Sequence, residues 1–251
     1  MADKKRLTYF VSDVHLGLKA GGADVVERRF LAFLDALPAE TESLFLLGDI
    51  FDFWYEYKYV IPTGHTRVLG RLAALVDRGV KVYFSIGNHD VWAYRYFEQE
   101  LGMIRLEQPA VVSVAGKQFC VGHGDGLGPV PRGYLLLRSI FHCRFLQRLF
   151  STLHPRWALG FGYAWSRHSR LSKTEDWVKY RFRGAEEPLW KFAVEFAQKH
   201  PVDFFVFGHY HTPGEEKLPG GASLYVLGDW AHDAEYLCFD GESLTWGSGR
   251  L

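Results

Sequence analysis

Residues 7–15 read LTYFVSDVH, an apolar run that stops at polar side chains able to bind a metal ion. The run Leu7–Val11 has the length and the aromatic and β-branched content of a buried strand. Asp13 and His15 follow it directly. Because α/β folds gather their ligands at the carboxyl ends of strands, these two side chains predict a site at the end of this strand.

The same arrangement recurs at four further places, each an apolar run followed by a glycine and then by polar residues. They are 44–52 (LFLLGDIFD), 80–90 (VKVYFSIGNHD), 118–125 (QFCVGHGD) and 204–211 (FFVFGHYH). A single Gly-Asp or Gly-His pair is more often an ordinary turn. Five such strand ends in one chain are hard to obtain from unrelated turns, so we predict that they share one site.

The intervening segments predict the fold class. Apolar residues with helical spacing lie at 26–37, 68–76 and 189–196, between the predicted strands. From about residue 110 the pattern changes: 111–114 and 118–121 read as a hairpin, and 224–227, 236–239 and 243–246 read as a closing antiparallel set. We expect an α/β protein in which two packed sheets carry helices on their outer faces. No linker divides residues 1–251, so we expect a single domain.

Composition excludes several classes of protein. With 48% hydrophobic and 23% charged residues in 251, the chain is neither disordered nor fibrous. No stretch reaches the roughly 18 apolar residues of a membrane span. The three cysteines are odd in number and widely spaced, which favours a reducing compartment. The apolar run after the N-terminal basic residues is shorter than the core of a signal peptide, so we expect a cytoplasmic protein.

The segment 126–185 differs from the rest of the chain. It carries helical patterns and no convincing strand, and we interpret it as a helical insertion near the site. Between Gly126 and Arg183 there are 11 basic residues against two acidic ones, a net charge of +9 in a chain that is neutral overall. Such a block predicts an anionic partner. The run Leu135–Leu137 lies between its arginines and favours lipid over nucleic acid.

The polar residues at the strand ends form a mixed oxygen and nitrogen donor set. Two carboxylates, one amide and four imidazoles suit divalent ions such as Mn, Fe or Zn better than Ca or Mg. Seven ligands exceed one tetrahedral site and fit two ions roughly 3.5–4 Å apart that share a carboxylate. The predicted ligands are Asp13, His15, Asp49, Asn88, His123, His209 and His211.

These motifs resemble those of the calcineurin-like metallophosphoesterases, whose pattern is D-x-H, G-D-x-x-D, G-N-H-D/E, G-H and G-H-x-H. All five stand here, over residues 13–211. The resemblance implies a four-layer α/β/β/α sandwich and two divalent ions, Mn²⁺ before Fe or Zn. It implies Asp13, His15, Asp49 and His211 as ligands of one ion, and Asp49, Asn88, His123 and His209 as ligands of the other.

Around these ligands we predict supporting roles for four residues. His89 is placed to reach the phosphoryl oxygen or the leaving group as a general acid, and Asp90 is the candidate that fixes its tautomer. The alternative for His89 is a hydrogen bond that supports the ligands only. Asp52 and Asp125 are expected to orient ligands rather than to bind an ion.

The motifs SDVHL, GDIFDFW and HGD, together with the VLGDW stretch at 226–230, resemble a narrower branch, the UDP-2,3-diacylglucosamine diphosphatases of lipid A biosynthesis. The resemblance implies hydrolysis of that glycolipid nucleotide to UMP and 2,3-diacylglucosamine 1-phosphate, with the insertion as a lid over the acyl chains. Many members of the branch carry Arg where this chain has His89.

For the lid we predict contacts to the substrate and to an anionic membrane. The candidates for the diphosphate, the sugar or the nucleotide are Arg132, Tyr134, Arg167, Ser169, Arg170 and Lys173. Arg138, Arg144 and Arg148 are expected to face anionic lipid at the inner side of the cell membrane. The alternative for each is a solvated basic face.

Two other functions stay open at this point. One is another dinuclear-metal phosphodiesterase or phosphatase that acts on a nucleotide or a nucleic acid. The other is a binding module that keeps the fold without activity, which the complete ligand set disfavours. The sequence makes no prediction of oligomeric state.

Overall fold

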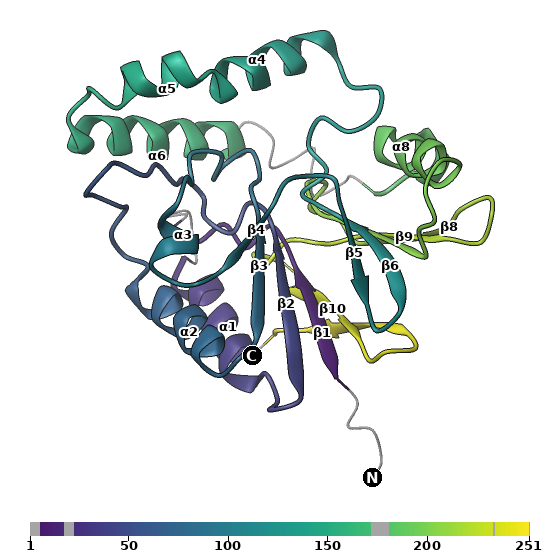
Figure 1. The fold of residues 1–251 in the computed structure, drawn as a ribbon. Coiled ribbons are helices and arrows are strands. Elements are labelled where there is room, and N and C mark those ends of the chain that lie inside the picture. The colour runs from purple at the N-terminus through teal and green to yellow at the C-terminus, as the bar shows by residue number, and fades with distance from the viewer. Residues whose placement is uncertain (1–5, 18–22, 172–180, 233, 251) are drawn as a thin grey trace.

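The computed structural model describes residues 6–17, 23–171, 181–232 and 234–250, and its core is a pair of facing β-sheets (Figure 1). The first sheet has the strand order β11-β10-β1-β2-β3-β4. β1 to β4 run parallel, and β10 and β11 add an antiparallel edge. Its strands are β1 (Leu7–Val11), β2 (Thr41–Leu47), β3 (Lys81–Ser85), β4 (Ile104–Leu106), β10 (Glu235–Phe239) and β11 (Leu244–Ser248).

The second sheet has the order β5-β6-β7-β9-β8. β6, β7 and β9 are parallel, while β5 and β8 pair antiparallel at the two edges. Its strands are β5 (Ala110–Val114), β6 (Lys117–Val121), β7 (Phe204–Phe207), β8 (Gly214–Lys217) and β9 (Ser223–Val226). The predicted hairpin of residues 111–121 is therefore confirmed as β5 and β6.

Three hydrophobic cores separate four layers, because successive side chains of a strand point to opposite faces. On β1, Tyr9 and Val11 pack toward α1 (Ala23–Ala36) and α2 (Thr66–Asp77). Phe10 between them packs against the second sheet, and its ring stacks on Phe45 and Phe119 at 4.9 and 5.3 Å. A third core lies between that sheet and α8 (Pro188–Ala197). The predicted α/β/β/α sandwich is confirmed.

One expectation about topology was wrong. The runs 224–227, 236–239 and 243–246 do not form one antiparallel set, since β9 belongs to the second sheet and runs parallel to β7, while β10 and β11 extend the first sheet beside β1. The turn at Asp240-Gly241 does join β10 to β11, with the Asp240 side chain accepting backbone hydrogen bonds from Glu242 and Ser243. Short apolar runs carry no signal of which sheet they join, because that choice depends on long-range pairing.

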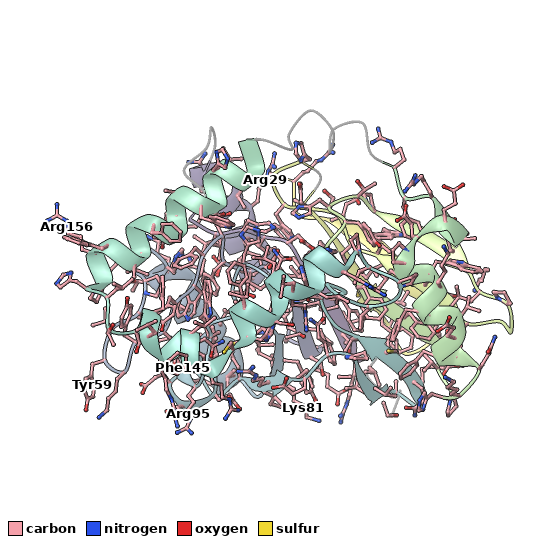
Figure 2. The ribbon with its side chains drawn as sticks, turned by 90° about the horizontal axis from the view of Figure 1, so that it is seen from above. Arg29, Tyr59, Lys81, Arg95, Phe145 and Arg156 are labelled. Atoms are coloured by element: carbon pink, nitrogen blue, oxygen red, sulfur yellow. The ribbon has the colours of Figure 1, made fainter. Side chains whose placement is uncertain are left out.

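The insertion consists of helices that lie above the carboxyl ends of the strands (Figures 1 and 2). These are α4 (Arg132–His142), α5 (Arg144–Phe150) and α6 (Pro155–Leu171); a 3₁₀ turn, η1 (Gly184–Glu186), precedes α8. Within the described part of 126–185 no residue lies in a strand. The short helix α3 (Tyr96–Gln99) lies in the connection between β3 and β4. Among the described helices none is long and apolar enough to cross a membrane.

Aromatic packing attaches the insertion to the loops that follow β2 and β3. The Trp92 ring lies 5.4 Å from Phe141 and 5.9 Å from Phe150, and its indole N–H donates to the Phe141 carbonyl. Tyr55, which is buried, donates its hydroxyl to the carbonyl of Gln147. Trp92 and Tyr55 therefore hold the insertion over the strand ends.

Candidate metal centre

The five predicted strand ends meet at one place, and most of the predicted ligands lie there in a strained backbone conformation. The left-handed region, with φ above zero, costs a side-chain-bearing residue about 1 kcal/mol or more. Several strand ends adopt this conformation, so contacts elsewhere in the tertiary structure must stabilise these turns. The turns direct the side chains toward one another. The predicted ligands with φ between 52° and 75° are Asp13, His15, Asp49, His209 and His211.

Two glycines allow the strand ends to approach one another. A Cβ on Gly87 would overlap the Asp49 carboxylate, and a Cβ on Gly208 would overlap Ser12 and Asp13. The glycines before these two motifs are thus required by close contact between loops.

The first group of ligand atoms surrounds Asp13. His15 Nε2 and His211 Nε2 lie 3.6 and 3.4 Å from Asp13 Oδ1, and His15 Nε2 lies 3.8 Å from Asp49 Oδ2. The ligand atoms of these four residues all lie within 4.8 Å of one another. They are the same four that the family resemblance assigns to one ion.

The second group lies on the other side of Asp49. His123 Nε2 is 3.4 Å from Asp49 Oδ2 and 3.2 Å from Asn88 Oδ1. The His209 ring lies 5.1 Å from the His123 ring. Asp49 therefore contacts both groups, which is the position that a bridging carboxylate requires.

The donor set fits divalent ions. Asp13 Oδ1 is buried and accepts no hydrogen bond from the described residues, although two imidazole nitrogens face it. Burial raises the pKa of Asp13, against the opposing effect of His211 and His123. Burial also acts on Asp49, but His123, His89 and His15 together hold its pKa well below the ordinary value. Buried carboxylates and imidazoles crowded in this way are stabilised by a cation.

His89 lies beside these groups with its orientation set by two neighbours. Its Nδ1 is 2.8 Å from the Asp52 carbonyl and 3.2 Å from Ser166 Oγ. Since a carbonyl only accepts, Nδ1 carries the proton and Nε2 is the ring nitrogen available to substrate. Ser166 is buried on α6 and was not predicted; no pattern around it in the sequence marks it.

The prediction that Asp90 fixes the tautomer of His89 was wrong. The Asp90 carboxylate is fully buried and accepts hydrogen bonds from the backbone N–H groups of Gly87 and Ile50, at 2.6 and 2.9 Å. Burial and the nearby Asp49 raise its pKa to about 7. Asp90 thus ties the loop after β3 to the loop after β2, and the backbone carbonyl of Asp52 performs the role expected of it.

Asp52 and Asp125 lie where ligand-orienting groups were expected. Asp52 Oδ1 is 3.8 Å from His15 Nδ1. Asp125 accepts a hydrogen bond from Gln108 Nε2, and Gln108 Oε1 in turn accepts from the backbone N–H groups of His123 and Gly124. Gln108 is a second residue that the sequence did not reveal, because it lies 15 positions from the loop it holds.

The predicted substrate contacts on the insertion have different outcomes. Tyr134 lies 6.3 Å from the His209 ring, and burial together with Asp125 raises its pKa above the ordinary value. Arg132 is exposed at the start of α4. The side chains of Arg167, Ser169 and Arg170, on α6, and the whole of Lys173 lie outside the described residues. Arg138 does not face lipid as predicted, since its Nε donates to Asp125 Oδ2 at 2.9 Å.

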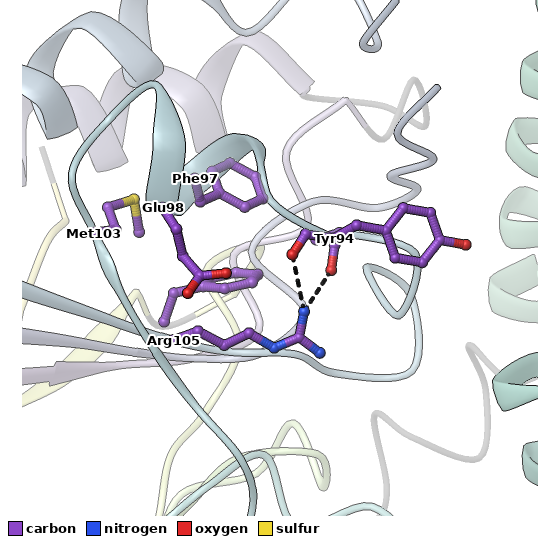
Figure 3. Close-up of a pocket in the computed structure, with 7 residues that line it drawn as sticks. Tyr94, Phe97, Glu98, Met103 and Arg105 are labelled. Atoms are coloured by element: carbon purple, nitrogen blue, oxygen red, sulfur yellow. Dashed lines mark hydrogen bonds between the residues drawn. The ribbon is translucent and has the colours of Figure 1, made fainter. Parts of the chain in front are cut away.

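A separate pocket lies beside α3 and β4. Its volume of about 10 Å³ admits about one water molecule, far below the roughly 300 Å³ of a small-molecule site. None of the predicted site residues lines it, and Arg105 closes one side by donating to the carbonyls of Ala93 and Tyr94 (Figure 3).

Comparison with known proteins identifies the scaffold. The model of the calcineurin-like phosphoesterases matches residues 7–213, which include all five strand-end motifs. The chain belongs to this family. It is therefore a phosphoesterase with a site for two divalent ions, and the binding module without activity is excluded as an interpretation of the fold.

Similar members of the family carry one name. A protein of Porphyromonas gingivalis named UDP-2,3-diacylglucosamine hydrolase is 37% identical over 249 residues, which cover 94% of this chain and 95% of that protein. A protein of Neisseria gonorrhoeae with the same name is 32% identical and covers 96% and 97%. A solved dimetal phosphatase from Danio rerio has a TM-score of 0.50 at 16% identity, covering 99% and 98%, which shows the shared fold alone.

Proposed function

We propose that this phosphoesterase hydrolyses the diphosphate of UDP-2,3-diacylglucosamine and releases UMP and 2,3-diacylglucosamine 1-phosphate. One observation carries the proposal: the helices that contact the metal centre also bear large exposed apolar side chains. α6 supplies Ser166 to His89, and α4 supplies Tyr134 beside His209. A water-soluble substrate needs no such surface, whereas two acyl chains do. The names of the relatives described above support the same substrate.

The apolar surface extends over all three helices of the insertion. On α6, the aromatic residues Trp157, Phe161 and Trp165 follow one another at four-residue spacing and are 73%, 60% and 52% exposed. The small residues that directly follow these aromatics, Ala158, Gly162 and Ser166, point in another direction around the helix and are buried. α4 and α5 add further exposed side chains: Leu135, Leu136, Leu137, Ile140, Phe145, Leu146 and Leu149. We assign this surface to the acyl chains, with the insertion as a lid on a single domain.

The chemistry follows from the groups that converge beneath the lid. When bound, two divalent ions at such a site provide a nucleophile at neutral pH and offset the charge that builds on the phosphoryl oxygens. Asp49, which contacts both ligand groups, would bind both ions. His89, as the imidazolium, would keep its Nδ1 proton on the Asp52 carbonyl and donate its Nε2 proton to the phosphoryl oxygen or the leaving group. The proposed ligands are Asp13, His15, Asp49, Asn88, His123, His209 and His211.

The proposal includes Mn²⁺ as the native ion, with Fe and Zn as alternatives, because borderline ions suit mixed carboxylate and imidazole donors. It also includes a cytoplasmic location with peripheral attachment to the inner face of the cell membrane. Arg144 and Arg148 are exposed on α5 beside Phe145 and Leu149. Basic groups that flank exposed apolar side chains are typical of surfaces that bind anionic lipid.

The test is to incubate the purified protein with Mn²⁺ and UDP-2,3-diacylglucosamine and to measure UMP and the lipid monophosphate. Equal amounts of the two products are expected. Turnover of bis-p-nitrophenyl phosphate by a protein inert toward the lipid would support a phosphodiesterase of nucleotides or nucleic acids instead.

A variant pair tests the assignment of the lid. Phe161→Ser with Trp165→Ser should raise the KM for the diacylated substrate and leave turnover of bis-p-nitrophenyl phosphate unchanged. Val111→Ser is the matched control, since Val111 is 46% exposed on the edge strand β5, away from the insertion. Equal losses on both substrates would show that α6 supports the core and does not bind acyl chains.

A further inference from the structure

The loop that follows β9 is a sixth strand end at the metal centre, and no ligand motif marks it. Its backbone is hydrogen-bonded to two ligand-bearing loops: Leu227 N–H donates to the Phe207 carbonyl at 2.7 Å, and Trp230 N–H donates to the Asp13 carbonyl at 3.2 Å. Trp230 is fully buried, with its ring 5.1 Å from Phe30. This loop is therefore held firmly against the site.

The loop places one carboxylate behind a predicted ligand. Asp229 is 6% exposed, and its Oδ2 lies 3.5 Å from His211 Nδ1. The other ring nitrogen of His211, Nε2, faces Asp13 Oδ1 at 3.4 Å. One nitrogen of the imidazole therefore faces the ion position and the other faces Asp229.

Asp229 is itself held by the residues that follow it. His232 N–H donates to Oδ1 at 2.9 Å, and His232 Nδ1 lies 2.9 and 3.0 Å from Oδ1 and Oδ2. The N–H of Ala234 donates to the backbone carbonyl of Asp229 at 3.0 Å. These contacts fix the orientation of the Asp229 carboxylate.

Each of two other histidine ligands also has an oxygen behind its Nδ1. The Leu47 carbonyl lies 3.1 Å from His123 Nδ1, and Asp52 Oδ1 lies 3.8 Å from His15 Nδ1. Such an acceptor fixes the tautomer and the ring plane of a ligating histidine and makes its free nitrogen a better donor to the ion. His211 differs from His123 in that its acceptor is charged.

We propose that Asp229 is a positioning residue for the metal centre, which holds His211 Nε2 on one of the two ions, and that His232 holds Asp229 in turn. The proposal rests on the assignment of His211 as a ligand. It predicts an asymmetric effect, because Asp229 contacts a ligand of one ion only. Removing the carboxylate frees the His211 ring to rotate and weakens the binding of that ion. The other ion, held by Asn88, His123 and His209 together with Asp49, keeps all of its ligands.

The test is calorimetric titration of the metal-free protein with Mn²⁺ alone, without substrate, so that its outcome is independent of the proposed glycolipid. In Asp229→Ala we expect one of the two ions to bind roughly 10–100-fold more weakly and the other to be unchanged. At Mn²⁺ concentrations that fill both positions in the unmodified protein, electron paramagnetic resonance should show the coupled pair there and a single isolated ion in the variant. Asp77→Ala, which removes an exposed carboxylate at the end of α2, is the control and should bind both ions normally.

Two further variants keep the proposal falsifiable if Asp229→Ala folds poorly. Asp229→Asn retains the size and one acceptor oxygen without the charge, and should weaken the same ion to a smaller extent. His232→Ala leaves Asp229 in place and should weaken that ion less than Asp229→Ala does. Binding of both ions to Asp229→Ala and Asp229→Asn with unchanged affinity would overturn the proposal. Equal weakening of both ions in folded Asp229→Asn would overturn it as well, since it would show a general structural role.

Discussion

Ser166 Oγ, on helix α6 of the insertion, lies 3.2 Å from Nδ1 of His89, which follows the predicted ligand Asn88. The contact spans 77 positions of the chain. It joins the segment that carries the exposed aromatic surface to the histidine proposed as the general acid. The orientation of the His89 ring therefore depends on the position of α6.

This contact predicts the behaviour of Ser166→Ala. We expect kcat to fall roughly 3- to 10-fold, the size of one lost hydrogen bond, because the His89 ring keeps only the Asp52 carbonyl to orient it. His89→Ala itself should lower kcat roughly 10²–10⁴-fold with the metal content intact. Steady-state kinetics with bis-p-nitrophenyl phosphate measures both. Ser151→Ala, an exposed serine after α5, is the control. An unchanged kcat in Ser166→Ala would show that the contact has no catalytic effect.

Asp49 is the residue that contacts both ligand groups, so its loss should affect both ions. We expect Asp49→Ala to abolish hydrolysis and to lower the bound metal per chain, measured by elemental analysis after gel filtration. The fold should survive, since the ligands lie on loops beyond the strand ends. Two ions and full activity in this variant would contradict the dinuclear assignment.

The ion pair between Arg138 and Asp125 predicts how α4 is held in place. In Arg138→Ala the Asp125 carboxylate, which is 3% exposed, loses its charged partner, and α4 loses its attachment to the loop of His123. We expect faster limited proteolysis within residues 126–185. Arg132→Ala, on the exposed first turn of the same helix, should be cleaved at the unmodified rate. Equal rates for both variants would show that the ion pair does not hold the helix.

The exposed basic residues of α5 predict salt-sensitive binding to membranes. Arg144→Glu with Arg148→Glu should weaken association with anionic vesicles, since each basic group near such a surface contributes about 1 kcal/mol. Binding of the unmodified protein should fall with rising salt as the Debye length shortens. Co-sedimentation measures both effects. Arg28→Glu with Arg78→Glu, exposed on α1 and at the end of α2, is the control with the same change in net charge. Equal weakening by both reversals would indicate that no particular face is involved.

His65 predicts a pH dependence of stability. It is buried against the Phe51 and Trp54 rings, its Nε2 makes no hydrogen bond to the described residues, and burial lowers its pKa from 6.5 to about 4. Below pH 6.5 the unfolded chain takes up a proton at this site that the folded chain refuses, so stability falls as pH drops from 6.5 toward 4, by a total of about 3 kcal/mol.

The variant His65→Leu isolates this contribution. Denaturant unfolding at pH 7.5 and pH 5, without metal, should show a smaller loss of stability in the variant than in the unmodified protein. The difference between the two proteins removes the titration of the other histidines. Equal losses would mean that His65 titrates normally in the folded state.

Much of the fold was predictable because its signals are local. A buried strand needs a run of apolar residues whatever its partners are, so β1 and β7 begin and end where the apolar runs do. The two-residue alternation within such runs then places one face toward helices and the other toward the second sheet. The pairing partner of each strand was harder to predict. The runs at 224–227 and 236–239 have similar sequences, yet they join different sheets.

The composition of the candidate site could also be predicted from the sequence, since Asp, His and Asn after a strand are chemically distinct from their surroundings. The hydrogen-bond and ion-pair partners of the site residues could not be predicted. Asp90 stands next to His89 and was expected to hold it, but its buried carboxylate binds the backbone of two loops instead. Arg138 belongs to a basic block by sequence and yet pairs with Asp125.

The sequence by itself determined the α/β layers, the five strand ends and the set of seven candidate ligands, because strand periodicity and ligand chemistry are properties of short segments. Only the tertiary structure decided which ring nitrogens of His15, His123 and His211 face the carboxylates of Asp13 and Asp49. Gln108 and Ser166 contact His123 and His89 across 15 and 77 positions of the chain, and Asp229 lies 3.5 Å from His211, which is 18 positions away. A contact of that kind depends on where two distant segments meet in space, and no local pattern of residues records it.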